Sequence, residues 1–159
     1  MGEARPFKID IADETLTRIR ERIAAYRWFP APAEGGPWQF GMAAEVMKDI
    51  QACWLDAYDW RAAEASLNSY PHFKAEIDGL DIHFMHIVGE AEGKRPLLLT
   101  HGWPGSFYEF HDAIGPLAFP SQHGGSVADA FDLVIPSLPG YGFSGKPTAP
   151  IGQRKTANL

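Results

Sequence analysis

The hydrophobic pattern of this chain changes its period once, near residue 70, and the change separates two kinds of structure. Before it, apolar residues recur every three or four positions, as on one face of a helix. After it, apolar and polar residues alternate, as in a half-buried strand. We therefore expect an α/β protein with a helical region over residues 1–70 and the first part of a sheet over residues 71–159.

Three helices are expected in the first region. Residues 13–27 and 42–57 both carry apolar stripes at helical spacing, and residues 59–69 suggest a third, shorter helix. Residues 30–37 are rich in proline and glycine and predict a loop. The single cysteine, Cys53, lies on the apolar stripe of the second helix and cannot form an internal disulfide. It is expected to fill the core.

The second region begins with a hairpin. Residues 73–77 and 80–84 alternate in polarity, and Asp78-Gly79 between them is a dipeptide typical of a tight hairpin turn. Residues 96–100 form a continuous apolar run, which predicts a strand buried on both faces of a parallel sheet.

A helix and another strand follow that run. Ser106 and Glu109 fit a capping box, which predicts that a helix begins there. Its expected buried stripe consists of Phe107, Phe110, Ile114 and Leu117. Residues 131–136 predict the next strand, so the hairpin leads into a β-α-β unit.

Composition excludes several classes of function. The net charge of −6 argues against a nucleic acid or an anionic membrane surface as the main partner. No stretch approaches the ~20 apolar residues of a membrane span, and the N-terminus lacks an apolar targeting segment, so a cytoplasmic location is expected. The histidines are expected at the surface or in supporting positions, without zinc spacing, and no metal or cofactor is expected. They are His72, His83, His86, His101, His111 and His123.

A glycine-rich segment follows the last predicted strand. Residues 140–145 match G-x-G-x-x-G, but the prolines after them leave no helix whose N-terminus could bind a pyrophosphate. Lys146 would be a P-loop lysine, yet Pro147 stands where the Mg²⁺-binding hydroxyl belongs. A glycine-rich loop at the end of a strand is the favoured interpretation.

The segment from His101 to Ser106 connects the predicted buried strand with the capped helix. Its two glycines and one proline indicate a sharp turn that can present a backbone N–H to a developing anion. A purely structural turn with a packed tryptophan explains the same residues equally well. Neither Ser106 nor Ser144 has the G-x-nucleophile-x-G frame of a nucleophile elbow.

Taken together, residues 101–107 and 136–144 resemble the epoxide hydrolases of the microsomal type, in the α/β-hydrolase superfamily. The prefix resembles that family's N-terminal domain at Arg27-Trp28, Tyr58-Asp59-Trp60-Arg61 and residues 73–80. The resemblance covers about residues 5–157 and implies an incomplete α/β-hydrolase sheet after the helical prefix.

The resemblance also implies a reaction. These enzymes convert an epoxide and water to a vicinal diol: an aspartate attacks the epoxide, and a histidine then activates the water that hydrolyses the ester. Here the backbone N–H of Trp103 would belong to the oxyanion hole, its ring would line the substrate pocket, and the bond to Pro104 is a candidate cis peptide. The residues implied to support the turn are His101, Gly102, Pro104, Gly105 and Tyr141.

In the family, the nucleophile, lid, acid and histidine follow the point at which residues 156–158 would begin a helix. We therefore expect an N-terminal part that is inactive alone and acts on a small apolar epoxide only in a complete enzyme. Two alternatives stay open. One is a fragment of another α/β hydrolase, a dehalogenase or an esterase. The other is a non-catalytic interaction module that associates with itself through an exposed sheet.

Overall fold

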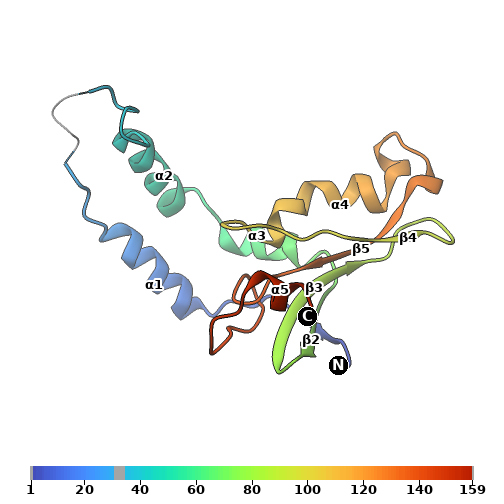
Figure 1. Cartoon of the computed structure of the whole chain (residues 1–159). Coiled ribbons are helices and arrows are strands. Elements are labelled where there is room, and N and C mark those ends of the chain that lie inside the picture. The colour runs from blue at the N-terminus through green and yellow to red at the C-terminus, as the bar shows by residue number, and fades with distance from the viewer. Residues whose placement is uncertain (1, 31–34, 159) are drawn as a thin grey trace. The chain divides into compact units, whose positions relative to one another are not determined.

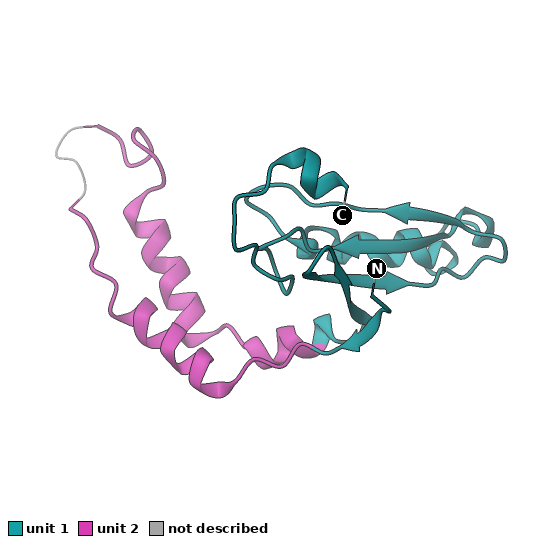
Figure 2. Ribbon diagram, turned by 60° about the horizontal axis from the view of Figure 1, so that its bottom comes forward, with its two compact units in different colours: residues 1–8, 66–159 teal, residues 9–65 magenta. Residues whose placement is uncertain are grey.

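The computed structural model describes residues 2–30 and 35–158 and shows an α/β fold, as expected. Contacts divide the chain into two compact units (Figure 2). One comprises residues 9–65 and is helical. The other comprises residues 1–8 and 66–159 and contains the sheet.

The helical unit confirms the three expected helices. They are α1 (Asp13–Ala24), α2 (Ala44–Asp56) and α3 (Trp60–Leu67), whose last two residues belong to the sheet unit. Within the predicted loop over residues 30–37, residues 31–34 lie outside the described residues. Gln51 of α2 connects the first two helices, since its side-chain nitrogen donates to the carbonyl of Ile23 at 2.5 Å.

The apolar stripe of α2 is not buried in the structure. Ile50 and Trp54 are both about half exposed, and Cys53 is exposed. The prediction that Cys53 fills the core is therefore wrong. Two packed helices share only one face, so apolar side chains outside that face stay accessible. A groove of about 850 Å³ runs along this surface, and its lining includes Ile23, Tyr26, Trp28, Met47, Ile50 and Trp54.

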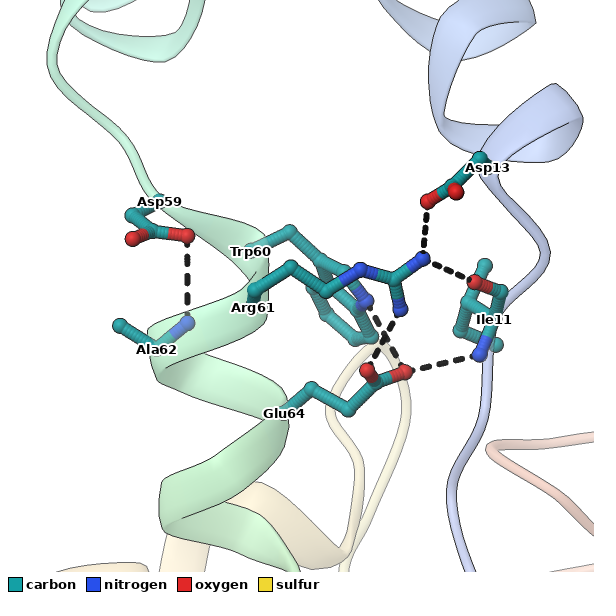
Figure 3. Close-up of polar contacts among 7 residues, drawn as sticks. All are labelled: Ile11, Asp13, Asp59, Trp60, Arg61, Ala62 and Glu64. Atoms are coloured by element: carbon teal, nitrogen blue, oxygen red, sulfur yellow. Dashed lines mark hydrogen bonds and ion pairs between the residues drawn. The ribbon is translucent and has the colours of Figure 1, made fainter.

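A charged cluster joins α3 to the segment before α1 (Figure 3). The buried Glu64 carboxylate accepts the N–H of Ile11 at 2.8 Å and the indole N–H of Trp60 at 3.2 Å. The Arg61 guanidinium donates to Glu64 at 2.6 Å, to the Ile11 carbonyl at 2.8 Å and to Asp13. This cluster links two segments about fifty residues apart in the sequence.

The sheet unit contains five strands in the order β1-β2-β3-β5-β4 (Figure 1). They are β1 (Arg5–Phe7), β2 (His72–Ile77), β3 (Leu80–Ile87), β4 (Arg95–Leu98) and β5 (Phe131–Pro136). The pairs β1–β2, β2–β3 and β3–β5 are antiparallel, and β4 is parallel to β5. Strand β1 has no counterpart among the predicted elements.

The hairpin is confirmed at the expected turn. Ile77 pairs with Leu80, and the two residues between them, Asp78 and Gly79, have φ values of 49° and 76°. Positive φ at both central residues is what a type I′ turn requires, and aspartate and glycine tolerate it better than most residues.

The predicted strand over residues 96–100 exists as β4, but it is not buried on both faces. Leu98 is 62% exposed. The reason is topological: β4 lies at the end of the sheet and pairs only with β5. A continuous apolar run indicated the strand correctly and its burial wrongly.

The segment between β4 and β5 supplies the crossover of the expected β-α-β unit. It begins with a 3₁₀ turn over Phe107–Phe110, where the Ser106 hydroxyl accepts the N–H of Tyr108 at 3.3 Å, and continues as α4 (His111–Ala118). Shorter helical segments are Pro120–His123, Val127–Asp129 and α5 (Gln153–Ala157). Core side chains of the unit include Phe107, Ile114, Leu133 and Ile135. Among the described residues, no helix is both long and apolar enough to cross a bilayer.

Candidate active site

The turn that follows β4 lies outside the carboxyl end of a parallel strand, where ligands bind in open α/β sheets. The Trp103–Pro104 peptide is cis, as predicted. The N–H of Gly105 donates to the carbonyl of Gly102 at 2.8 Å and closes the turn. Trp103 stands at its apex and is 83% exposed. Within the described residues, no group accepts a hydrogen bond from the Trp103 N–H.

His101 connects this turn to the loop after β5. The residue is buried, and its Nε2 accepts the backbone N–H of Leu138 at 3.1 Å. Its Nδ1 donates to the carbonyl of Gly102 at 3.2 Å, and its ring contacts the ring of Tyr141 with centroids 5.2 Å apart. The neutral tautomer with the proton on Nδ1 satisfies both hydrogen bonds at once. Tyr141 therefore packs against the imidazole that faces the turn.

The two glycines of the turn differ in their surroundings. A Cβ at Gly105 would lie 1.2 Å from Oε1 of Glu109, so a side chain there would displace that carboxylate. A Cβ at Gly102 would meet no described atom within 4 Å. The exposed, flexible Glu109 side chain can move aside, so steric crowding alone does not account for glycine at either position.

The sheet unit also contains a buried pair of histidines, His72 of β2 and His83 of β3. His72 Nδ1 and His83 Nε2 are 2.9 Å apart, and His72 Nε2 donates to the carbonyl of Leu67 at 2.9 Å. Burial lowers the pKa of His72. Burial first, and then the charge that His72 would carry if protonated and the charge of Lys74, lower the pKa of His83 to about 3. Both rings are therefore neutral at pH 7.

Two serines and three aromatic rings surround His83. Its Nδ1 lies 2.8 Å from the Ser137 hydroxyl, and its backbone N–H donates to the Ser144 hydroxyl at 2.9 Å. That hydroxyl in turn donates to the Ser137 carbonyl at 2.6 Å. The rings of Phe7, Phe107 and Phe143 lie 5.1 to 5.5 Å from the imidazole, centroid to centroid.

Sequence reasoning did not find this network, because it treated each histidine separately. The signal was available in the hairpin register. Once Ile77 is placed opposite Leu80, Lys74 pairs with His83 and His72 with Met85, so both histidines lie on one face of adjacent strands. No group of three or more His, Cys, Asp or Glu side chains suited to a metal ion occurs in the described part of the chain.

The chain is similar to proteins of known family. A family model described as "Epoxide hydrolase N terminus" matches residues 4–110. Epoxide hydrolase 1 of Sus scrofa is 42% identical over an alignment of 144 residues, and the match covers 88% of this chain and 32% of that protein. The chain thus spans about a third of the length of this curated relative.

Solved structures agree with the sequence comparison. The epoxide hydrolase of Aspergillus niger is 37% identical, with a TM-score of 0.80 over 93% of this chain and 38% of that one. The juvenile hormone epoxide hydrolase of Bombyx mori is 36% identical, with a TM-score of 0.81 over 94% of this chain and 35% of that one. The expected resemblance is confirmed: this chain belongs to the epoxide hydrolase family of the α/β-hydrolase superfamily and corresponds to its N-terminal part.

Proposed function

We propose that this chain forms the N-terminal part of an enzyme that hydrolyses a small apolar epoxide to a vicinal diol through an aspartyl-ester intermediate. Family membership supports the reaction class. The observation that carries the proposal is the turn at Trp103 and Pro104 outside the end of β4, where the Trp103 N–H is available as a donor within the described part of the chain.

The chemistry requires such a donor in the second step. Hydrolysis of the ester passes through a tetrahedral oxyanion, and one preorganised N–H donor stabilises the transition state by about 3 kcal/mol. The Trp103 N–H would supply that hydrogen bond, and the exposed indole ring would form an apolar wall for the substrate. The residues that would hold the turn are His101, Gly102, Pro104, Gly105 and Tyr141.

The remaining groups would come from polypeptide outside these 159 residues, in the two thirds of the relatives' length that this chain does not span. They are the nucleophilic aspartate, the acid, the histidine that activates water and the two lid tyrosines. The 159-residue chain alone is therefore expected not to turn over an epoxide. An assay of the purified chain with styrene oxide tests this, and turnover above background that survives Trp103→Ala would contradict it.

A chimera tests the positive half of the proposal. Residues 1–159 would replace the corresponding part of Epoxide hydrolase 1 of Sus scrofa. We expect the chimera to form a diol from styrene oxide. Trp103→Ala is expected to raise KM more than it lowers kcat, because it removes the ring and keeps the backbone N–H. A folded chimera that forms no diol, or that turns over only a haloalkane or an ester, would refute the proposed reaction.

A further inference from the structure

We infer that the buried pair His72–His83 positions the candidate oxyanion turn, acting through Ser137, Ser144 and the loop between these two serines. The catalytic meaning of this inference rests on the proposed function. The geometry does not, because it follows from a connected set of hydrogen bonds in the sheet unit. His72 and His83 are positioning residues: neither of them touches the turn itself.

The direction of each hydrogen bond between Leu67, His72, His83 and Ser137 is fixed. The carbonyl of Leu67 can only accept, so the Nε2 of His72 carries a proton and its Nδ1 is an acceptor in the neutral ring. His83 must then donate from Nε2, which leaves its Nδ1 as an acceptor. The hydroxyl of Ser137 must donate to that Nδ1. A single arrangement of protons therefore satisfies every hydrogen bond from Leu67 to Ser137.

His83 binds both ends of the loop over residues 138–143. At the first end, the Ser137 hydroxyl donates to the ring of His83, and the Ser137 N–H donates to the His83 carbonyl at 2.8 Å. At the other end, the Ser144 hydroxyl accepts the backbone N–H of His83 and donates to the Ser137 carbonyl. Both ends of the loop over residues 138–143 therefore meet His83 of β3, and the N–H of the adjoining Gly145 donates to the carbonyl of Asp81 on the same strand at 2.6 Å.

His101 connects this loop to the candidate oxyanion turn. The loop carries the N–H of Leu138 and the ring of Tyr141, the two groups that contact His101. His101 in turn donates to the carbonyl of Gly102. That carbonyl also accepts the N–H of Gly105 at 2.8 Å, and it belongs to the same planar peptide group as the N–H of Trp103. The bonds from His101 and Gly105 therefore set the direction of the Trp103 N–H together.

The packing leaves this network little freedom. A Cβ at Gly142, where φ is +49°, would lie 2.5 Å from the hydroxyl oxygen of Ser137. The three phenylalanine rings around His83 would accommodate an apolar side chain, and burying an imidazole there has a desolvation cost. A side chain that only filled this volume would need no hydrogen bonds, so the polar connections point to a positioning role.

The test uses the 159-residue chain and ¹⁵N-labelled amides. His83→Leu keeps the volume and removes the ring nitrogens. We expect the Leu138 amide to exchange with solvent at least tenfold faster and the Trp103 and Leu138 amide resonances to move. His86→Leu is the matched control, since His86 lies on the same strand and its side chain makes no hydrogen bond to the described residues of this network. It is expected to leave both amides unchanged.

A second variant decides the matter if His83→Leu does not fold. Ser137→Ala removes the hydroxyl that donates to the His83 ring and should give the same tenfold faster exchange at Leu138. Folded variants whose Leu138 and Trp103 amides match the unmodified chain, with only a lower melting temperature, would overturn the inference. In the chimera, Ser137→Ala should lower kcat and leave KM unchanged. A chimera without diol formation would refute the proposed function, whereas unchanged amides would refute the positioning role.

Discussion

The two units each contain a polar cluster in a sheltered place, and the two clusters have opposite electrical character. In the sheet unit, His72 and His83 are buried together and neutral. In the helical unit, Glu64 is buried but ionised, with Arg61 beside it. The side chain of Arg61 is 43% exposed, whereas His83 has no exposed surface.

This difference shows what decides the charge of a sheltered group. Around His83, burial is the largest influence, and the positive charge that His72 would carry if protonated and the charge of Lys74 act in the same direction, so the pKa falls. At Glu64, the N–H of Ile11 lowers the pKa more than burial raises it, and Arg61 lowers it further. A partner at the edge of the solvent keeps a charge in place that burial alone would neutralise.

The largest effect is expected from breaking the neutral cluster. His83→Ala opens a cavity and leaves the Ser137 hydroxyl and the His72 Nδ1 unpaired, which should cost about 3–5 kcal/mol of unfolding free energy at pH 7. Urea unfolding followed by the methyl NMR signals of Leu133 and Ile135 measures the change. His86→Ala, on the same strand, should cost less than half as much. Equal losses for the two variants would contradict the network.

The next largest effect is a dependence on pH. The unfolded chain binds a proton at His83 near pH 6.5, and the folded chain only near pH 3, so stability falls as the pH falls between these values. At about 1.4 kcal/mol per pH unit, the loss from pH 6.5 to 4.5 should be about 2–3 kcal/mol. His83→Gln removes this contribution, so the stability difference between the two proteins should shrink in acid. Parallel pH curves would count against neutral burial.

The charged cluster should lose less when it is broken. Glu64→Ala removes the acceptor for the Ile11 N–H and the Trp60 indole, which should cost about 1–2 kcal/mol in the helical unit. Thermal unfolding followed by tryptophan fluorescence reports on this unit. Glu21→Ala, at an exposed position of α1, is the matched control and should change stability by less than about 0.5 kcal/mol. A loss larger than that of His83→Ala would reverse the comparison.

The smallest effect is expected at the exposed edge of the sheet, in contrast to a buried position on the neighbouring strand. Leu98→Lys adds a charge at the exposed edge of β4 and should change stability by less than about 0.5 kcal/mol. Ile135→Lys, on the neighbouring strand at a fully buried position, should prevent folding. If the chain associates with itself through this edge, Leu98→Lys should also lower the mass measured by light scattering. A large loss of stability from Leu98→Lys would show that the edge is covered in solution.

The elements of the sheet unit were predictable where a local pattern determines them. Alternation on both sides of Asp78-Gly79 determines the hairpin, and apolar runs mark β4 and β5. Strand β1 was missed because three residues are too few to show a period. The burial of β4 and of Cys53 was misjudged because neighbours in space, not in sequence, decide how much of a side chain is covered.

The candidate site also has one part that the sequence predicted and one part that it did not. The cis Trp103–Pro104 turn was expected from its motif, since the family resemblance extends to every residue of that segment. The histidine network was not, because hydrogen bonds such as the one between His83 and Ser137 join residues more than fifty positions apart. The predicted hairpin register would have brought His72 and His83 together, but the serines become visible only once β5 is placed beside β3.

The exposed position of Trp103 has an optical consequence. The chain has five tryptophans, and Trp28, Trp38, Trp54 and Trp60 all lie in the helical unit. Replacing those four with phenylalanine would leave a single emitter at the apex of the turn. Because the residue is 83% exposed, its indole should fluoresce at long wavelength and shift to the blue when a ligand or a further segment of protein covers it. The turn thus carries its own reporter of occupancy.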